Sequence, residues 1–133
     1  MRYMLDTNIV SHLLREHPSV VAQVKAVPMA SLCISTITEA ELHFGLAKRP
    51  ANKPLHRAVH ELLIRIESVA LGSAAAHAYG AVRLGMMQSG KTLAPLDLLI
   101  ASHAISIGAI LVTNDQAIKQ LKGLQVQDWT EAS

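Results

Sequence analysis

The chain has 133 residues, of which 50% are hydrophobic and 17% charged, and its formal net charge is +2. A chain of this length forms one domain of about 100–200 residues with a proper core, so we expect a single domain over residues 1–133. The small net charge does not by itself indicate a nucleic-acid-binding protein, and no apolar run reaches the roughly 18 residues that a membrane span needs.

Apolar periodicity and turn residues predict strands that alternate with helices along the whole chain. The predicted strands are residues 2–5, 31–35, 68–71, 109–112 and 124–126. The predicted helices are residues 8–15, a helix between Pro18 and Pro28, and residues 36–47, 55–66, 74–88, 96–106 and 116–121. Capping-box spacing (Thr36 with Glu39, or Thr38 with Glu41) marks the start of the third helix. The alternation predicts a three-layer α/β/α fold with a mainly parallel sheet of about five strands, and the aliphatic run 109–112 is typical of a central strand.

Cysteine usage and the N-terminus suggest a cellular compartment. Cys33 is the only cysteine and lies in an apolar run, so it forms no disulfide within the chain and we expect a buried, inert thiol. Asp6 and Asn8 interrupt the first apolar run too early for a signal peptide. We therefore expect a cytoplasmic protein without a membrane partner.

Four acidic residues occupy unusual places. Asp6 directly follows the first strand, Glu41 lies in the helix after the second strand, Asp97 begins the most apolar helix, and Asp115 follows the strand 109–112. Segments that follow parallel strands emerge at one edge of the sheet, where open α/β folds place their sites. We expect Asp6, Glu41 and Asp115 to gather there, joined by Asp97. Taken singly, Glu41, Asp97 and Asp115 can also be simple helix-dipole residues, worth about 0.3–1 kcal/mol each.

Clustered carboxylates repel and raise one another's pKa, and a divalent cation relieves this repulsion. An all-oxygen acidic pocket suits Mg²⁺ or Mn²⁺, which would orient a phosphodiester and stabilise its leaving oxygen. Thr7, Asn8 and Thr113 are predicted to hold the acids in place by hydrogen bonds.

Four segments carry a family resemblance: residues 4–8 (MLDTN), 38–45 (TEAELHFG), 95–104 (PLDLLIASHA) and 111–115 (LVTND). In this order and at these spacings they resemble the motifs of VapC-type toxins, the PIN-domain ribonucleases of type II toxin–antitoxin systems, and the similarity extends over nearly the whole chain to Trp129. The resemblance implies a PIN-like domain in which Asp6, Glu41, Asp97 and Asp115 bind the metal. Some related toxins carry the fourth acid a few residues later; Lys119 stands there in this chain, so only Asp115 can serve.

The resemblance also implies an activity and partners. It implies Mg²⁺- or Mn²⁺-dependent endonucleolytic cleavage of RNA, often tRNA or rRNA, which inhibits translation. It implies a homodimer and a cognate antitoxin that covers an apolar groove. The candidate groove residues, each of which can equally be a core residue, are Val10, Leu13, Leu14, Val20 and Val24.

Basic and histidine residues offer weaker signals. Lys48, Arg49 and Lys91 lie in loops beside two of the acidic motifs, so we predict that they contact RNA phosphates. Interleaved aromatic residues are missing, so an aromatic platform for single-stranded bases is not expected. His56 and His60 share a helix face but lack a third zinc ligand, which favours a solvated face.

Two other classes of function stay open. An aspartyl-nucleophile phosphatase also begins with an acid after its first strand, but it needs a second Asp where this chain has Asn8. A non-catalytic RNA- or protein-binding module on the same fold would have to cluster four acids without a metal, which is costly.

Overall fold

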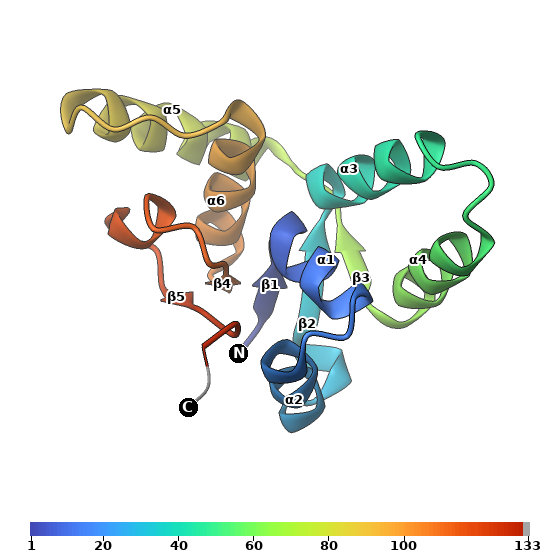
Figure 1. Cartoon of the computed structure of the whole chain (residues 1–133). Helices are drawn as coiled ribbons and strands as arrows, with labels where there is room; N and C mark the ends of the chain where they lie inside the picture. Colours follow the sequence, from blue (N-terminus) through green and yellow to red (C-terminus); the bar gives the residue numbers. More distant parts are fainter. Residues whose placement is uncertain (132–133) are drawn as a thin grey trace.

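The computed structural model describes residues 1–131, in which five parallel strands form one sheet of order β3-β2-β1-β4-β5 (Figure 1). The strands are β1 (Tyr3–Leu5), β2 (Leu32–Ser35), β3 (Glu67–Val69), β4 (Ile110–Val112) and β5 (Val126–Gln127). The helices are α1 (Thr7–Leu14), α2 (Pro18–Ala26), α3 (Thr36–Ala47), α4 (Lys53–Arg65), α5 (Ser73–Gln88) and α6 (Pro95–Ile107), with short 3-10 turns η1 (Met29–Ser31) and η2 (Ile118–Gln120). The predicted three-layer α/β fold is thus confirmed, with an entirely parallel sheet.

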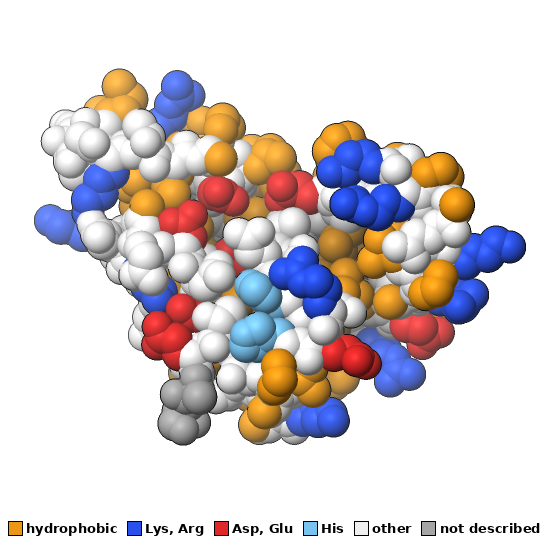
Figure 2. Space-filling model, in the orientation of Figure 1, with side chains coloured by type: hydrophobic (Ala, Val, Ile, Leu, Met, Phe, Trp, Pro, Cys, Tyr) orange, Lys and Arg blue, Asp and Glu red, His pale blue; other side chains and the backbone are white. Residues whose placement is uncertain are grey.

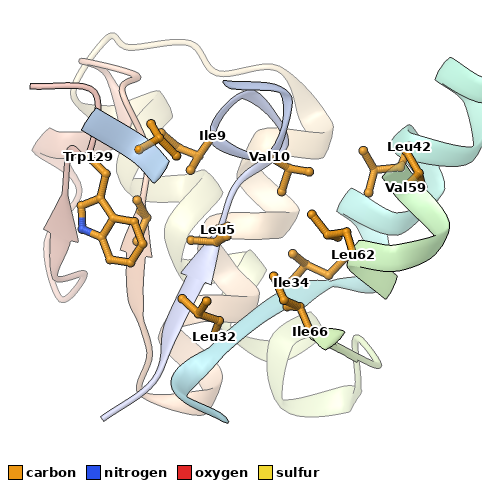
Figure 3. Packing of buried hydrophobic residues seen from close by; sticks show 12 residues of the cluster. Leu5, Ile9, Val10, Leu32, Ile34, Leu42, Val59, Leu62, Ile66 and Trp129 are labelled. Atoms are coloured by element: carbon orange, nitrogen blue, oxygen red, sulfur yellow. The ribbon is translucent and has the colours of Figure 1, made fainter. Parts of the chain in front are cut away.

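Alternating side chains of the strands build two cores on opposite faces of the sheet. On one face, Leu5, Ile34 and Val112 pack against α1, α2 and α4 (Figure 3). On the other face, Met4 and Leu111 pack against α6. Cys33 belongs to this second core and is fully buried, as predicted.

The order of the strands reverses direction beside β1. From β1 the chain moves outward through β2 to β3, then returns to the other side of β1 as β4 and continues to β5. Leu5 pairs with Val112 at the carboxyl ends of β1 and β4. This reversal is a topological switch point, where parallel sheets leave a crevice at their carboxyl edge. Asp6 and Thr113 are the first residues beyond these two strand ends.

Polar caps explain where the site-bearing helices begin. Asp6 caps α1, and the side chain of Ser35 caps α3 by accepting a hydrogen bond from Ile37 N at 3.1 Å. The predicted capping box at α3 is therefore wrong, because the residue at the N-cap position is Ser35 rather than Thr36 or Thr38. Pro95 begins α6, and Gly108 ends it in a left-handed conformation with φ 67°.

Helix α6 is the most apolar helix, and α5 packs along it (Figure 1). Within residues 1–131, no helix combines the length and apolar character needed to cross a membrane.

The C-terminal elements differ most from the sequence-based expectation. The helix predicted at 116–121 is only the turn η2, because Asp115 Oδ1 accepts hydrogen bonds from Ala117 N at 2.8 Å and Ile118 N at 3.4 Å and closes a tight turn. The last strand is Val126–Gln127 rather than 124–126, and β3 begins one residue early, at Glu67. The central strand is β1, while the strand expected at the centre, β4, lies between β1 and β5.

Candidate active site

Asp6 stands at the centre of the site. Its backbone N–H donates to Val112 O at 3.1 Å, which continues the pairing of β1 with β4, and its Oδ1 accepts a hydrogen bond from Ile9 N at 2.9 Å. The side chain is only 4% exposed. The carboxylate of Asp6 is thus the N-cap of α1.

The environment makes the Asp6 carboxylate hard to ionise. Burial is the main reason why the pKa of Asp6 rises from 3.8 to about 6, and the negative charges of Asp97 and Asp115 raise this pKa further. Hydrogen bonds from the Thr113 side chain and from Ile9 N–H act in the opposite direction. Positive charge beside this buried carboxylate would favour its ionised form.

Glu41 and Asp97 approach the same place from α3 and α6. The Thr7 hydroxyl donates to Glu41 Oε1 at 2.5 Å and lies 3.2 Å from the buried hydroxyl of Thr38. The pKa of Asp97 is raised by burial and by the negative charges of Asp115 and Glu41. Asp6 is therefore close enough to Asp97 and Asp115, and Asp97 to Glu41, for their charges to interact. The sequence suggested Thr38 only as a capping residue one helical turn before Glu41, and its hydrogen bond with Thr7 was not predicted.

The carboxylate of Asp115 accepts hydrogen bonds from the backbone. Its Oδ1 accepts the two N–H groups of η2, and its own N–H donates to the buried Thr113 hydroxyl at 3.1 Å. This acid is thus both a turn-capping residue and a neighbour of Asp6 and Asp97.

Figure 2 shows Asp and Glu side chains gathered at the notch between the α5–α6 side of the molecule and α3, with Lys and Arg side chains over α3 beside them. The surface therefore offers an acidic centre with basic groups close by, an arrangement suited to a phosphate-containing ligand and a cation.

Comparison with known proteins identifies the family. The PIN domain family model matches residues 3–124. The chain is 33% identical to the ribonuclease VapC2 of Rickettsia felis over 97% of this chain and 98% of that protein. It is 30% identical to the tRNA(fMet)-specific endonuclease VapC of Shigella flexneri, over 98% of this chain and 99% of that protein. The chain belongs to the PIN-domain family and is a VapC-type toxin ribonuclease.

Solved VapC-type structures share the fold over nearly the full length. The chain resembles the Rickettsia felis VapBC2 structure, solved with a DNA fragment from the promoter, with a TM-score of 0.88 over 97% of this chain and 99% of that one. It resembles VapBC-1 of Haemophilus influenzae at 30% identity with a TM-score of 0.87, over 98% of this chain and all of that one. The similarity therefore holds for the entire sheet and the helices that carry the acids.

The donor set of this VapC-type site suits a hard divalent cation. It consists of carboxylates, and burial together with the neighbouring negative charges raises the pKa of Asp6 and of Asp97, a condition that Mg²⁺ or Mn²⁺ relieves. Over residues 1–131, no three His, Cys, Asp or Glu side chains are already drawn together at metal-ligand spacing. The acids thus influence one another's charge without being drawn together at metal-ligand spacing. Of the two histidines predicted on a solvated face, His60 is exposed, whereas His56 is half-buried and its Nε2 lies 3.0 Å from Arg49 O.

The other predicted site residues lie in different surroundings, and not all of them are near the acids. Asn8 is exposed, and among residues 1–131 its side chain makes no hydrogen bond to the acids. Lys48 and Arg49 are exposed at the end of α3. Lys91 instead donates to Gln120 Oε1 and lines a separate cavity of about 670 Å³ between α5, α6 and η2, which none of the four acids lines.

Proposed function

We propose that this protein is a Mg²⁺- or Mn²⁺-dependent endoribonuclease toxin whose metal-binding, catalytic acids are Asp6, Glu41, Asp97 and Asp115. The observation that carries the proposal is the mutual electrostatic influence of these acids at the switch point of the sheet. We further propose that residues 1–133 act as one domain.

Each residue has a distinct role in the proposed reaction. Asp6, buried and fixed by the α1 cap, anchors the cation, and Asp97 and Asp115 share its charge. Thr7 holds Glu41 in place, and Thr113 steadies Asp6 and Asp115. A bound Mg²⁺ or Mn²⁺ would orient the scissile phosphate and make the attacking water more acidic.

The proposed substrate is an RNA of the translation machinery, either tRNA or rRNA, so that cleavage inhibits translation. Support comes from the Shigella flexneri relative, which is named a tRNA(fMet)-specific endonuclease, and from the exposed basic residues Lys48 and Arg49 at the end of α3, the helix that carries Glu41. Lys91 is a weaker candidate for RNA contact, because it is engaged with Gln120.

The proposed partners are a cognate antitoxin and a second copy of the chain, in the cytoplasm. Solved relatives are VapBC toxin–antitoxin complexes, which supports the antitoxin. Val10 and Val20 belong to the buried core, so only the half-buried Leu13, Leu14 and Val24 remain as groove candidates on α1 and α2. The apolar side chains that α5 exposes are the surface that we assign to the homodimer.

The test is an RNA-cleavage assay with Mn²⁺ or Mg²⁺ that compares the wild type with Asp6→Asn. Asparagine keeps the helix cap but loses the negative charge, so we expect cleavage to fall by at least a hundredfold while the fold remains. Chelation with EDTA should abolish cleavage by the wild type. Equal cleavage by the two proteins would refute the proposed site, and RNA binding without cleavage by either would favour the binding-module alternative.

A further inference from the structure

Phe44 is the one aromatic side chain in residues 1–131 that points mostly into solvent, with 64% of its surface exposed. The rings of Tyr3 and Trp129 pack together with centroids 5.3 Å apart, and Tyr79 is half-buried beside Arg83. A single exposed apolar residue is ordinary on a protein surface. A functional role for Phe44 therefore has to be argued from its position relative to the active-site acids.

That position is one helical turn beyond an active-site acid. Glu41, Phe44 and Lys48 follow one another at i, i+3 and i+7, so they share one face of α3. At 1.5 Å of rise per residue, the Cα atoms of Phe44 and Lys48 lie about 4.5 Å and about 10 Å along the axis from the Cα atom of Glu41. Because Thr7 fixes Glu41 at the acidic centre, this face leads directly outward from the site.

The face combines a ring with positive charge. Lys48 Nζ lies 4.6 Å above the centroid of the Phe44 ring, and Arg49 is exposed next to it. Figure 2 shows the basic side chains over α3 beside the acidic notch. A cation–π contact at an exposed site amounts to roughly a two- to fivefold preference, whereas stacking of a nucleobase on an aromatic ring amounts to roughly five- to 150-fold. A base can therefore displace the ammonium from the ring, which frees Lys48 for a phosphate.

We propose that Phe44, Lys48 and Arg49 form a subsite for one unpaired RNA nucleotide next to the cleaved phosphate, with its base stacked on Phe44 and its phosphate held by the two cations. This inference rests on the proposed function, because it names where RNA lies relative to the acids. It also revises the expectation from the sequence: one aromatic on the right helical face is enough for a platform, without interleaved aromatic residues.

The positive charge beside Phe44 favours RNA, rather than an apolar side chain of a partner protein, as the group that contacts the ring. The cation over the ring is Lys48, and the exposed Arg49 follows it in the chain. These cations complement a phosphate but not the apolar surroundings of a buried protein anchor. The subsite also continues the face that carries Glu41, so a strand that enters the acidic centre passes over the ring.

The test measures binding in the cleavage-defective Asp6→Asn background. The probe is a single-stranded oligoribonucleotide with one 2-aminopurine, whose fluorescence is quenched by stacking. Phe44→Leu should weaken binding about tenfold and abolish the quenching, whereas Phe44→Trp should preserve both. Lys48→Gln should lower the slope of log Kd against log salt by about 0.7, the loss of one phosphate contact. Ile64→Ala on α4, another exposed apolar position, serves as the matched control and should change neither value.

Parallel cleavage kinetics without the Asp6 change separate the two proposals. If the wild type cleaves RNA and Phe44→Leu leaves affinity, quenching and KM unchanged, the subsite is wrong and the nuclease stands. If the wild type cleaves nothing but Phe44→Leu still abolishes binding and quenching, the nuclease is wrong and the stacking subsite stands. If Phe44→Leu, with a native circular dichroism spectrum, loses antitoxin binding but retains RNA binding, the face is a protein-docking surface and the subsite is overturned.

Discussion

At the scale of single residues, the ionised carboxylate of Asp6 destabilises the folded protein. Its carboxylate is almost fully buried beside Asp97 and Asp115, and burial is the main cause that raises its pKa to about 6. The acids of an active site are often held in such unfavourable surroundings, because the same surroundings bind a cation when one arrives. The sequence showed that Asp6 follows a buried strand; its raised pKa depends on neighbours that only the fold brings close.

Asp6→Asn should therefore stabilise the protein at neutral pH in the absence of divalent cations. Because the folded pKa lies above the unfolded value, the unfavourable charge is absent below about pH 4, grows between pH 4 and pH 6, and is fully present above pH 6. The pKa shift of about 2 units corresponds to at most about 3 kcal/mol, so we expect about 1–3 kcal/mol of added stability at pH 7 and little at pH 4. Urea unfolding in EDTA at both pH values measures this difference.

Asp128→Asn is the control, because the pKa of Asp128 is shifted in the direction opposite to that of Asp6. Burial raises the pKa of Asp128, but hydrogen bonds from Thr130 and the ion pair with Lys119 Nζ at 3.0 Å outweigh burial and lower it. The favourable charge is lost as pH falls through the folded pKa, so Asp128→Asn should destabilise the protein at pH 7 and have little effect in strong acid. If the two variants respond to pH in the same direction, this electrostatic description of Asp6 is incorrect.

At the scale of elements, Ser35 connects two of the helices that carry the acids. Its Oγ caps α3 and lies 2.8 Å from Nδ1 of the buried His103 on α6. Burial lowers the pKa of His103, which favours the neutral ring that can accept the serine proton. The relative position of Glu41 and Asp97 thus depends in part on one buried hydrogen bond.

Ser35→Ala should cost about 2–3 kcal/mol of stability, since it removes an N-cap and leaves a buried ring nitrogen without its partner. Asn52→Ala is the matched control, because Asn52 caps α4 at the exposed surface by accepting from Leu55 N at 3.1 Å. That change should cost only about 1 kcal/mol. Equal losses in chemical denaturation would show that the contact with His103 contributes nothing.

The sequence predicted the long elements well for identifiable reasons. The helices α3 and α6 have clear apolar patterns with a polar or proline start, and the aliphatic runs of β1 and β4 have few other interpretations. The choice of cap at α3 was wrong because Ser35, Thr36 and Thr38 are all chemically suitable, and only the backbone geometry selects Ser35. The segment after Asp115 was predicted as a helix because the pattern does not reveal that the acid itself closes a turn.

At the scale of the whole molecule, the sheet brings together four acids that are far apart in the sequence. Asp6 and Asp115 follow β1 and β4 on the two sides of the switch point, while α3 and α6 deliver Glu41 and Asp97. The alternation of strands and helices was sufficient to predict this meeting, because parallel strands share a carboxyl edge. The exposure of Phe44 was not predictable in the same way, since it depends on which helix faces the neighbouring elements cover.

The most direct test of the central claim, that these acids form one divalent-cation site, is thermal unfolding with increasing Mn²⁺. The wild type should gain about 2.7 kcal/mol at a hundredfold excess over Kd, a rise in Tm of several degrees. The double variant Asp6→Asn, Asp97→Asn should begin at a higher Tm in EDTA and gain almost nothing from Mn²⁺. An equal gain in Tm for the two proteins, or none for the wild type, would contradict the account.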